Sequence, residues 1–252
     1  MKDVILKKIK ELEKQENIQI LYACESGSRA WGYASEDSDY DVRFIYKRPK
    51  DWYLKLEKTD DHLDFPVDDE LDLSGWDLDK TLKLLKKSNP SLMEWFQSPI
   101  VYLKNEAFFE EIKILTDEYV SAENQIHHYF HLAESTYENY LQSPMVKTKK
   151  YIYAIRPLLA CMWIEKHKEI PPISLDELVE LPIEDIGFSE FLKLLERKKT
   201  GGEFDLEPQN PLLQKFVEDK LAYFAGYVKK LSNPAKTNYT DLNHFFLKWI
   251  GE

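Results

Sequence analysis

Four residues near the N-terminus have the types and the spacing needed to hold a polyphosphate beside a divalent cation. Gly27 and Ser28 form a turn before a segment that starts as a helix, and backbone N–H groups at a positive helix end suit phosphate oxygens. After ten intervening residues, Asp39 and Asp41 lie at alternate positions of an extended segment, so their carboxylates share one face. Because Mg²⁺ takes oxygen ligands and keeps some from substrate phosphate, the two features together predict magnesium-assisted chemistry on a phosphate group.

A third carboxylate would complete a pair of metal ions that stabilises both the attacking and the leaving oxygen of an in-line displacement. Asp72 is the residue we expect in this role, because alternation along a short strand-like run separates it from Leu71 and Leu73. Glu70 shares its face and Asp69 is close by, so both remain alternatives.

Basic and aromatic residues offer further contacts to a phosphate or a base. Arg29 follows the turn and suits two-pronged binding of phosphate, although an ion pair with the acidic stretch that follows is the simpler alternative. Lys149, Tyr153 and Arg156 recur at helical spacing, so one helix face could contact the triphosphate or base. A solvated helix face explains the same pattern, whereas Pro157 beside Arg156 favours a specifically shaped helix.

The periodicity of the apolar residues predicts the elements that carry these groups. In the N-terminal part, the predicted elements are helix 3–16, strands 18–24, 40–46 and 70–74, helix 76–86 and a helix between Asn89 and Ser98. Further along, helical segments cover about 104–116, 120–141, 147–168, 186–199, 210–231 and 239–250. These patterns predict an α+β domain at 1–103 and an all-helical domain at 104–252.

Composition and charge describe a globular protein and exclude several classes. The 252-residue chain has 43% hydrophobic residues and a net charge of −11, so broad binding to duplex nucleic acid, which needs a basic surface, is not expected. The N-terminus lacks the apolar core of a signal peptide, and no apolar run approaches membrane-spanning length. Cys24 and Cys161 lie far apart without metal-ligand spacing, so both are expected to be buried thiols in a reducing, cytoplasmic compartment.

Three sequence blocks carry a resemblance to a known family. The Gly-Ser turn, followed after about ten residues by Asp-x-Asp, resembles the signature of the DNA polymerase β-like nucleotidyltransferase superfamily. The longer blocks resemble the RlaP-type predicted nucleotidyltransferases, named for their association with RNA ligases in RNA repair: GSRAWGYASEDSDYDVRFIY, DLSGWDLDKTLKLLKKSNPSLMEWFQSPIVY and KKYIYAIRPLLACMWI. The resemblance spans at least residues 25–165, with the blocks in the expected order.

The resemblance implies a small mixed sheet with flanking helices, a bound nucleoside triphosphate, expected to be ATP, and transfer of its nucleotidyl group with loss of pyrophosphate. It implies that Gly27 and Ser28 bind the triphosphate and that Asp39 and Asp41 bind Mg²⁺, with two ions expected. By the same resemblance, Asp72 binds the ion nearest the acceptor and favours deprotonation of the attacking hydroxyl. The helical domain is expected to close one side of the nucleotide cleft.

The motif leaves the acceptor open. An RNA or tRNA end suits the acidic chain better than a long duplex does. A protein hydroxyl, as in AMP transferases of the antitoxin type, and a small molecule such as an aminoglycoside are alternatives. A catalytically silent nucleotide-binding module is a further alternative, although the presence of both Asp39 and Asp41 argues against it. For an active enzyme, AMP is the nucleotide that we expect to be transferred.

Overall fold

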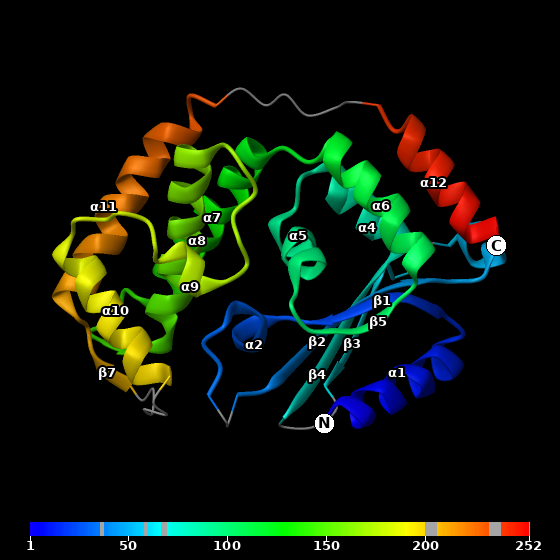
Figure 1. Cartoon of the computed structure of the whole chain (residues 1–252), viewed down its shortest axis with the longest axis horizontal. Coiled ribbons are helices and arrows are strands. Elements are labelled where there is room, and N and C mark those ends of the chain that lie inside the picture. Colours follow the sequence, from blue (N-terminus) through cyan, green and yellow to red (C-terminus); the bar gives the residue numbers. More distant parts are fainter. Residues whose placement is uncertain (36–37, 58–59, 67–69, 200–205, 232–237, 252) are drawn as a thin grey trace. The chain divides into compact units, whose positions relative to one another are not determined.

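The elements of the computed structural model divide the chain into two units (Figure 1). The structure describes residues 1–35, 38–57, 60–66, 70–199, 206–231 and 238–251. Unit 1 comprises Met1–Ala30, Asp39–Val120 and Ala235–Glu252, and unit 2 comprises Trp31–Ser38 and Ser121–Pro234. Unit 1 holds a mixed five-stranded sheet with helices, and unit 2 is mainly helical, so the predicted α+β fold is confirmed.

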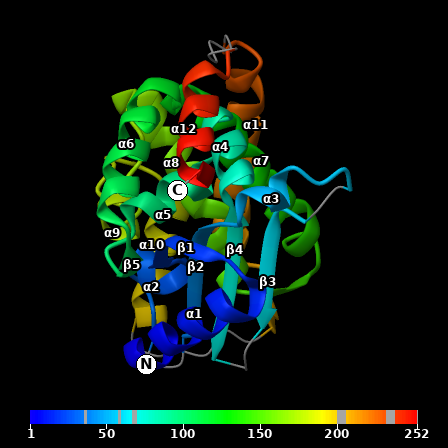
Figure 2. The same ribbon diagram turned by 90° about the vertical axis from the view of Figure 1, so that its right-hand side faces the viewer.

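The sheet of unit 1 has the strand order β3-β4-β2-β1-β5, and Figure 2 shows β3 along one edge. The strand bounds are β1 Gln19–Glu25, β2 Tyr40–Lys47, β3 His62–Pro66, β4 Leu71–Asp77 and β5 Val101–Lys104. β1 pairs antiparallel with β2 and β5, β2 pairs parallel with β4, and β3 pairs antiparallel with β4. The sequence predicted β1, β2 and β4, but it did not predict the two short edge strands.

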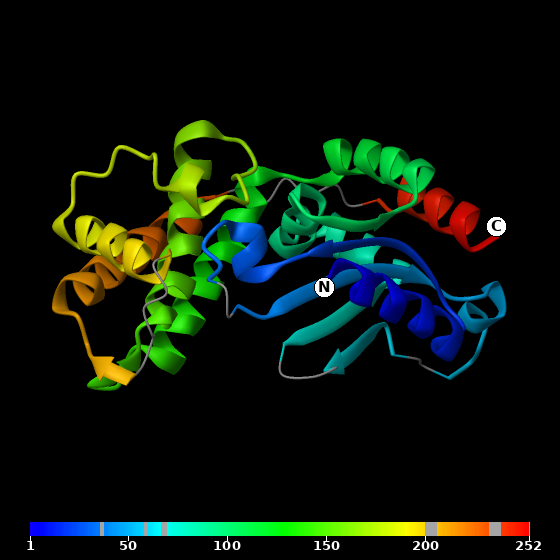
Figure 3. The same cartoon turned by 60° about the horizontal axis from the view of Figure 1, so that its bottom comes forward.

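One face of the sheet is covered by α1 (Lys2–Glu16), which lies against the strands in Figure 3. Ile5 and Ile9 of α1 are fully buried and belong to one cluster with Val42 and Phe44 of β2. The α1 residues recur at helical spacing and the β2 residues at alternate positions, so both periodicities point into the same core.

The opposite face is covered by three helices: α4 Leu78–Lys86, α5 Pro90–Gln97 and α6 Glu106–Tyr119. Tyr22 of β1 contacts the rings of Phe96 in α5 and Phe109 in α6, with centroids 5.8 and 5.3 Å away. Trp76 of β4 stacks on Trp95 of α5 at 3.8 Å. The aromatic residues of this region therefore pack helices on the sheet.

The junction between β4 and α4 differs from the prediction. The sequence pattern predicted a helix from Trp76, whereas β4 continues to Asp77 because its parallel pairing with β2 extends to Tyr46. The Asp77 carboxylate then caps α4 by accepting the Asp79 N–H at 2.9 Å, and it also accepts the Tyr53 hydroxyl at 3.0 Å. Asp77 is only 2% exposed, and this burial raises the pKa of its carboxyl to about 6.

We expect the buried Asp77 carboxylate to make the fold less stable as the pH rises. Its pKa in the folded protein lies above the unfolded value of about 3.9, so the protonated form stabilises the fold at low pH. This contribution is lost as the pH rises through about 6. Asp77→Asn keeps an oxygen that can cap α4, but its amide does not ionise in this pH range. The difference in unfolding free energy, variant minus wild type, should therefore grow by about 2 kcal/mol between pH 4 and pH 7. Urea unfolding of both proteins at several pH values measures this difference. A difference that stays constant with pH would contradict the expectation.

Unit 2 is built around α7 (Ala122–Tyr140) and α8 (Lys149–His167), which pack against each other. The middle of α8 is buried on most sides and contributes Ile155, Leu158 and Leu159 to the core of this unit. The other elements are α9 Leu175–Leu178, α10 Ile186–Lys199, α11 Pro211–Val228 and the strand pair β6 Met145–Lys147 and β7 Leu206–Pro208. No helix in the described part of the chain is both long and apolar enough to cross a membrane.

The helix α12 (Thr240–Gly251) belongs to unit 1. Lys47 at the end of β2 donates a hydrogen bond to the Trp249 carbonyl at 2.6 Å, and Lys248 pairs with Glu111 of α6 at 2.6 Å. The sequence-based division placed the α6 and α12 segments with the helical half at 104–252, whereas both helices lie in unit 1.

Candidate active site

The Gly-Ser turn lies where β1 leads into the short helix α2 (Gly27–Trp31), as Figure 1 shows. Gly27 has a φ of 59°, and a Cβ at this position would lie 2.0 Å from Asp41 Oδ2. The preceding Ser26 N–H donates to the Asp41 carbonyl at 2.8 Å. The next residue, Ser28, is half-buried. The turn is therefore in direct contact with the Asp41 carboxylate, and only glycine leaves room for it.

Asp41 and Asp72 face each other across β2 and β4. The two strands run parallel, and the two residues are direct partners in the register. Arg43 joins them, because its Nη2 lies 3.1 Å from Asp41 Oδ1 and its Nη1 lies 2.9 Å from Asp72 Oδ2. The side chain of Asp72 is 47% exposed and that of Asp41 is 32% exposed, so solvent reaches both carboxylates.

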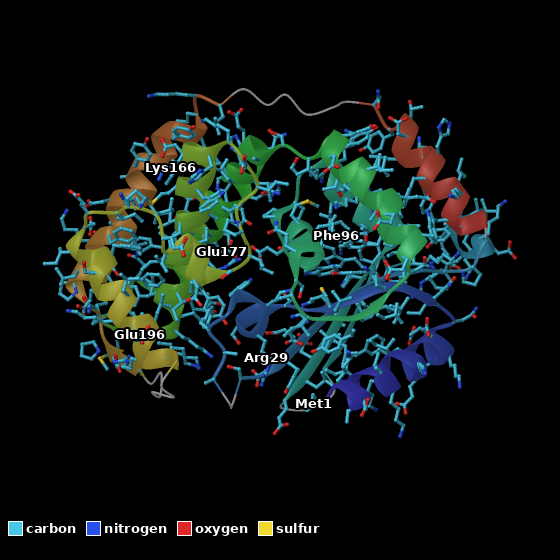
Figure 4. All side chains as sticks on the ribbon, viewed as in Figure 1. Met1, Arg29, Phe96, Lys166, Glu177 and Glu196 are labelled. Atoms are coloured by element: carbon cyan, nitrogen blue, oxygen red, sulfur yellow. The ribbon has the colours of Figure 1, made fainter. Side chains whose placement is uncertain are left out.

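Asp39 directly precedes β2 and is exposed. Its carbonyl accepts a hydrogen bond from Arg29 Nε at 3.2 Å, and the Arg29 guanidinium lies 3.8 Å from the centre of the Tyr40 ring. Arg29, labelled in Figure 4, thus links α2 to the start of β2. Acidic residues 36–37, which could have paired with Arg29, and Asp69, an alternative third carboxylate, lie outside the described residues.

Glu25 and Arg43 belong to this constellation, and the sequence patterns did not assign either of them to it. Glu25 ends β1 and is fully buried, with Oε1 accepting the Asp41 N–H at 2.8 Å and Oε2 accepting the Tyr102 hydroxyl of β5. A charged residue that ends an otherwise apolar strand was the available signal for Glu25. For Arg43 the signal was the alternation that puts it on the same face of β2 as Asp41.

Negative charge accumulates at this end of the sheet. Burial raises the pKa of Asp41. The charges of Asp72 and Asp39 raise this pKa further, while the Arg43 guanidinium lowers it. Burial also raises the pKa of Glu25, against hydrogen bonds to its carboxylate that lower it. Carboxylates whose ionisation is opposed by burial, and further by the charges of their neighbours, favour a cation beside them.

Lys149, Tyr153 and Arg156 lie on α8 in unit 2. Arg156 is 2% exposed; its guanidinium lies 4.2 Å from the centre of the Trp31 ring, and its Nη2 donates to the Ile173 carbonyl at 3.1 Å. Tyr153 meets the same Trp31 ring edge-on at 6.0 Å, whereas Lys149 is exposed at the first position of α8. The structure thus brings Tyr153 and Arg156 together at Trp31, and the contact of the three residues with triphosphate or base stays a prediction.

Comparison with known proteins identifies the family. The family model described as "RlaP: RNA repair pathway DNA polymerase beta family" matches residues 1–248. The chain is 43% identical over 253 aligned positions to "Uncharacterized protein YcgL" of Bacillus subtilis (strain 168), covering 100% of this chain and 97% of that protein. The family description indicates a nucleotidyltransferase with a relation to RNA repair. As the three sequence blocks predicted, the chain belongs to the RlaP family of DNA polymerase β-like proteins.

Proposed function

We propose that the protein is a Mg²⁺-dependent nucleotidyltransferase that transfers AMP from ATP to an acceptor hydroxyl and releases pyrophosphate. The observation that carries the proposal is the direct contact of the Gly27 backbone with Asp41, beside the register partner Asp72. Membership of the RlaP family supports the same chemistry.

The residues of the turn bind the triphosphate in this proposal. Gly27 has no side chain, so phosphate oxygens can approach its backbone, and Ser28 adds a hydroxyl donor. Arg29 lies on the same short helix and can bind phosphate through two parallel N–H donors when it leaves the Tyr40 ring.

Asp39, Asp41 and Asp72 would hold the two Mg²⁺ ions. Their carboxylate oxygens are the ligands that Mg²⁺ takes, and a cationic group, the Arg43 guanidinium, already lies between Asp41 and Asp72. Within the described ranges, no three metal-binding side chains gather closely enough to enclose an ion by themselves, so triphosphate oxygens would complete the coordination. Bound there, the ions would neutralise the triphosphate and make the acceptor hydroxyl more acidic.

Asp72 serves the acceptor in this proposal. Its side chain is more exposed than that of Asp41, 47% against 32%, so it is the better placed of the two to meet an incoming hydroxyl. The acceptor oxygen forms a bond to the α-phosphorus, and the bond from that phosphorus to the pyrophosphate oxygen breaks. Asp72 orients the hydroxyl and favours the loss of its proton, which passes to solvent water as the new bond forms.

An RNA or tRNA end is the acceptor that we propose. The family description names RNA repair, and a chain with a net charge of −11 is poorly suited to long duplexes but compatible with a single end. A protein hydroxyl is the second candidate acceptor. The buried free thiols of Cys24 and Cys161 favour a reducing compartment, the cytoplasm, for the reaction.

The proposal is tested by incubating the protein and Mg²⁺ with each α-³²P-labelled nucleoside triphosphate and either total cellular RNA or cell lysate. We expect label in RNA or in a protein band, which names the acceptor class, and none with Asp39→Asn/Asp41→Asn. Asp117→Asn, which neutralises an exposed carboxylate on α6, is the control and should keep the activity. Triphosphate binding without any labelled product would overturn the transfer and favour a silent nucleotide-binding module.

A further inference from the structure

Glu25 is a buried acid whose two carboxylate oxygens bind different parts of unit 1. It ends β1 immediately before the Gly-Ser turn, and none of its surface is exposed, so it cannot touch a substrate. Oε1 accepts the Asp41 N–H at 2.8 Å, and Oε2 accepts the hydroxyl of Tyr102. Burying a carboxylate is costly unless its oxygens find donors, so both contacts are needed to keep it in place.

The backbone of Glu25 is held by hydrogen bonds to the segment between α5 and β5. Its N–H donates to the Ile100 carbonyl at 2.9 Å, and its carbonyl accepts the Ser98 hydroxyl at 2.6 Å. These bonds anchor the end of β1 to the segment that leads into β5. The Glu25 carboxylate therefore projects from a fixed point of the sheet.

Asp41 is held at both of its backbone groups by the chain that forms the turn. Its N–H is bound by the Glu25 carboxylate at 2.8 Å, and its carbonyl is bound by the Ser26 N–H at 2.8 Å. Residues 25 and 26 lead directly into Gly27, whose backbone contacts the Asp41 carboxylate. The same two hydrogen bonds thus set the spacing between the turn and that carboxylate.

We propose that Glu25 is a positioning residue, which holds Asp41 at the distance from the Gly-Ser turn that metal binding and nucleotidyl transfer require. This inference rests on the proposed function. Groups that act on one reacting centre tolerate little displacement, since an error of about 1 Å can lower a rate by about 100-fold. Tyr102 supports this role by fixing the second carboxylate oxygen of Glu25.

Three variants separate positioning from a structural contribution. Glu25→Gln keeps an oxygen acceptor for the Asp41 N–H, whereas Glu25→Met has a similar length and no strong acceptor. Asn105→Ala removes the cap of α6, where the side chain accepts the Phe108 N–H at 3.1 Å, and lowers stability in the same unit without removing any hydrogen bond of Glu25 or Asp41. It is the matched control for a purely structural loss.

Steady-state kinetics with labelled triphosphate supply one readout. Mn²⁺ affinity, measured by electron paramagnetic resonance in the presence of a non-hydrolysable triphosphate that completes the coordination, supplies the other. We expect Glu25→Met to lower kcat by about 10- to 100-fold with little change in KM for the triphosphate, and to weaken Mn²⁺ binding by about 10-fold. Glu25→Gln should restore most of both quantities. Asn105→Ala should change neither, although its unfolding temperature falls.

Each outcome decides the inference separately from the proposed function. If wild type forms labelled product and Glu25→Met matches it in kcat and Mn²⁺ affinity, the positioning role is overturned and the proposed function stands. Equal losses in Glu25→Met and Asn105→Ala would also overturn it. If neither wild type nor any variant forms product, the proposed function fails, and the Mn²⁺ affinity alone tests the positioning role. Weaker Mn²⁺ binding in Glu25→Met, but not in Asn105→Ala, would support the positioning of Asp41. Equal affinity in Glu25→Met and wild type, or no Mn²⁺ binding by any of the proteins, would overturn it.

Discussion

The double substitution Asp39→Asn/Asp41→Asn should lower the rate of nucleotidyl transfer by at least about 1,000-fold, because metal-assisted charge stabilisation supplies several kcal/mol and about 1.4 kcal/mol corresponds to a factor of ten. The fold should survive the change. Burial raises the pKa of Asp41, so a neutral amide there removes an unfavourable buried charge. It also removes the attraction to Arg43 at 3.1 Å, and the two effects oppose each other.

Initial rates with labelled triphosphate and thermal unfolding measure activity and stability separately. The unfolding temperature should change little while the activity disappears, which distinguishes a lost metal ligand from a misfolded protein. Asp117→Asn on α6 removes a comparable charge far along the chain from the turn and should leave both quantities unchanged. A double variant that transfers nucleotides at the wild-type rate would contradict the assignment of the carboxylates.

Gly27→Ala should lower the transfer rate by about 100-fold or more, because the new Cβ displaces a group that must be placed within about 1 Å. The Cβ would lie 2.0 Å from Asp41 Oδ2 and 2.9 Å from the carboxyl carbon, so the carboxylate has to move. The backbone adds a second cost, since an alanine at a φ of 59° is strained by about 1–2 kcal/mol. Urea unfolding should show this loss, and initial rates should show the larger effect.

Gly226→Ala is the matched control for this substitution. Gly226 lies inside α11, and apart from its two chain neighbours and the backbone of its own helix, no atom lies within 4 Å of the position that its Cβ would take. Alanine should therefore stabilise the helix by about 0.5–1 kcal/mol and leave the transfer rate unchanged. If Gly27→Ala kept the wild-type rate, the contact between the turn and Asp41 would have no part in the reaction.

Local sequence patterns predicted those parts of the site that depend only on the alternation of side chains along a single strand. Val42 and Phe44 alternate with Asp41 along β2, and the two apolar residues lie in the buried cluster with α1, on the opposite face to Asp41. Alternation also separated Asp72 from its apolar neighbours, and the parallel register brings it opposite Asp41. The helices were predictable for the same reason, since their apolar residues recur within each segment.

Contacts between distant segments were not predictable in this way. The hydrogen bond between Tyr102 and Glu25 joins residues 77 positions apart, and no local pattern records such a pair. The edge strands β3 and β5 have five and four residues, and each is established by hydrogen bonds to a single neighbouring strand, which a local pattern does not record. The start of α4 was misplaced because the pairing of Trp76 and Asp77 with β2 outweighs the helical periodicity of the same residues.

The place of α12 in unit 1 has a consequence for synthesis of the protein on the ribosome. Phe108 of α6 packs against Trp249 of α12, with ring centroids 5.3 Å apart, yet residues 121–234 are made between the two. At about 5–20 residues per second, translation of that stretch takes on the order of ten seconds. During this interval the aromatic residues of α6 lack the partners that α12 supplies, so unit 1 can complete its packing only after unit 2 has been made.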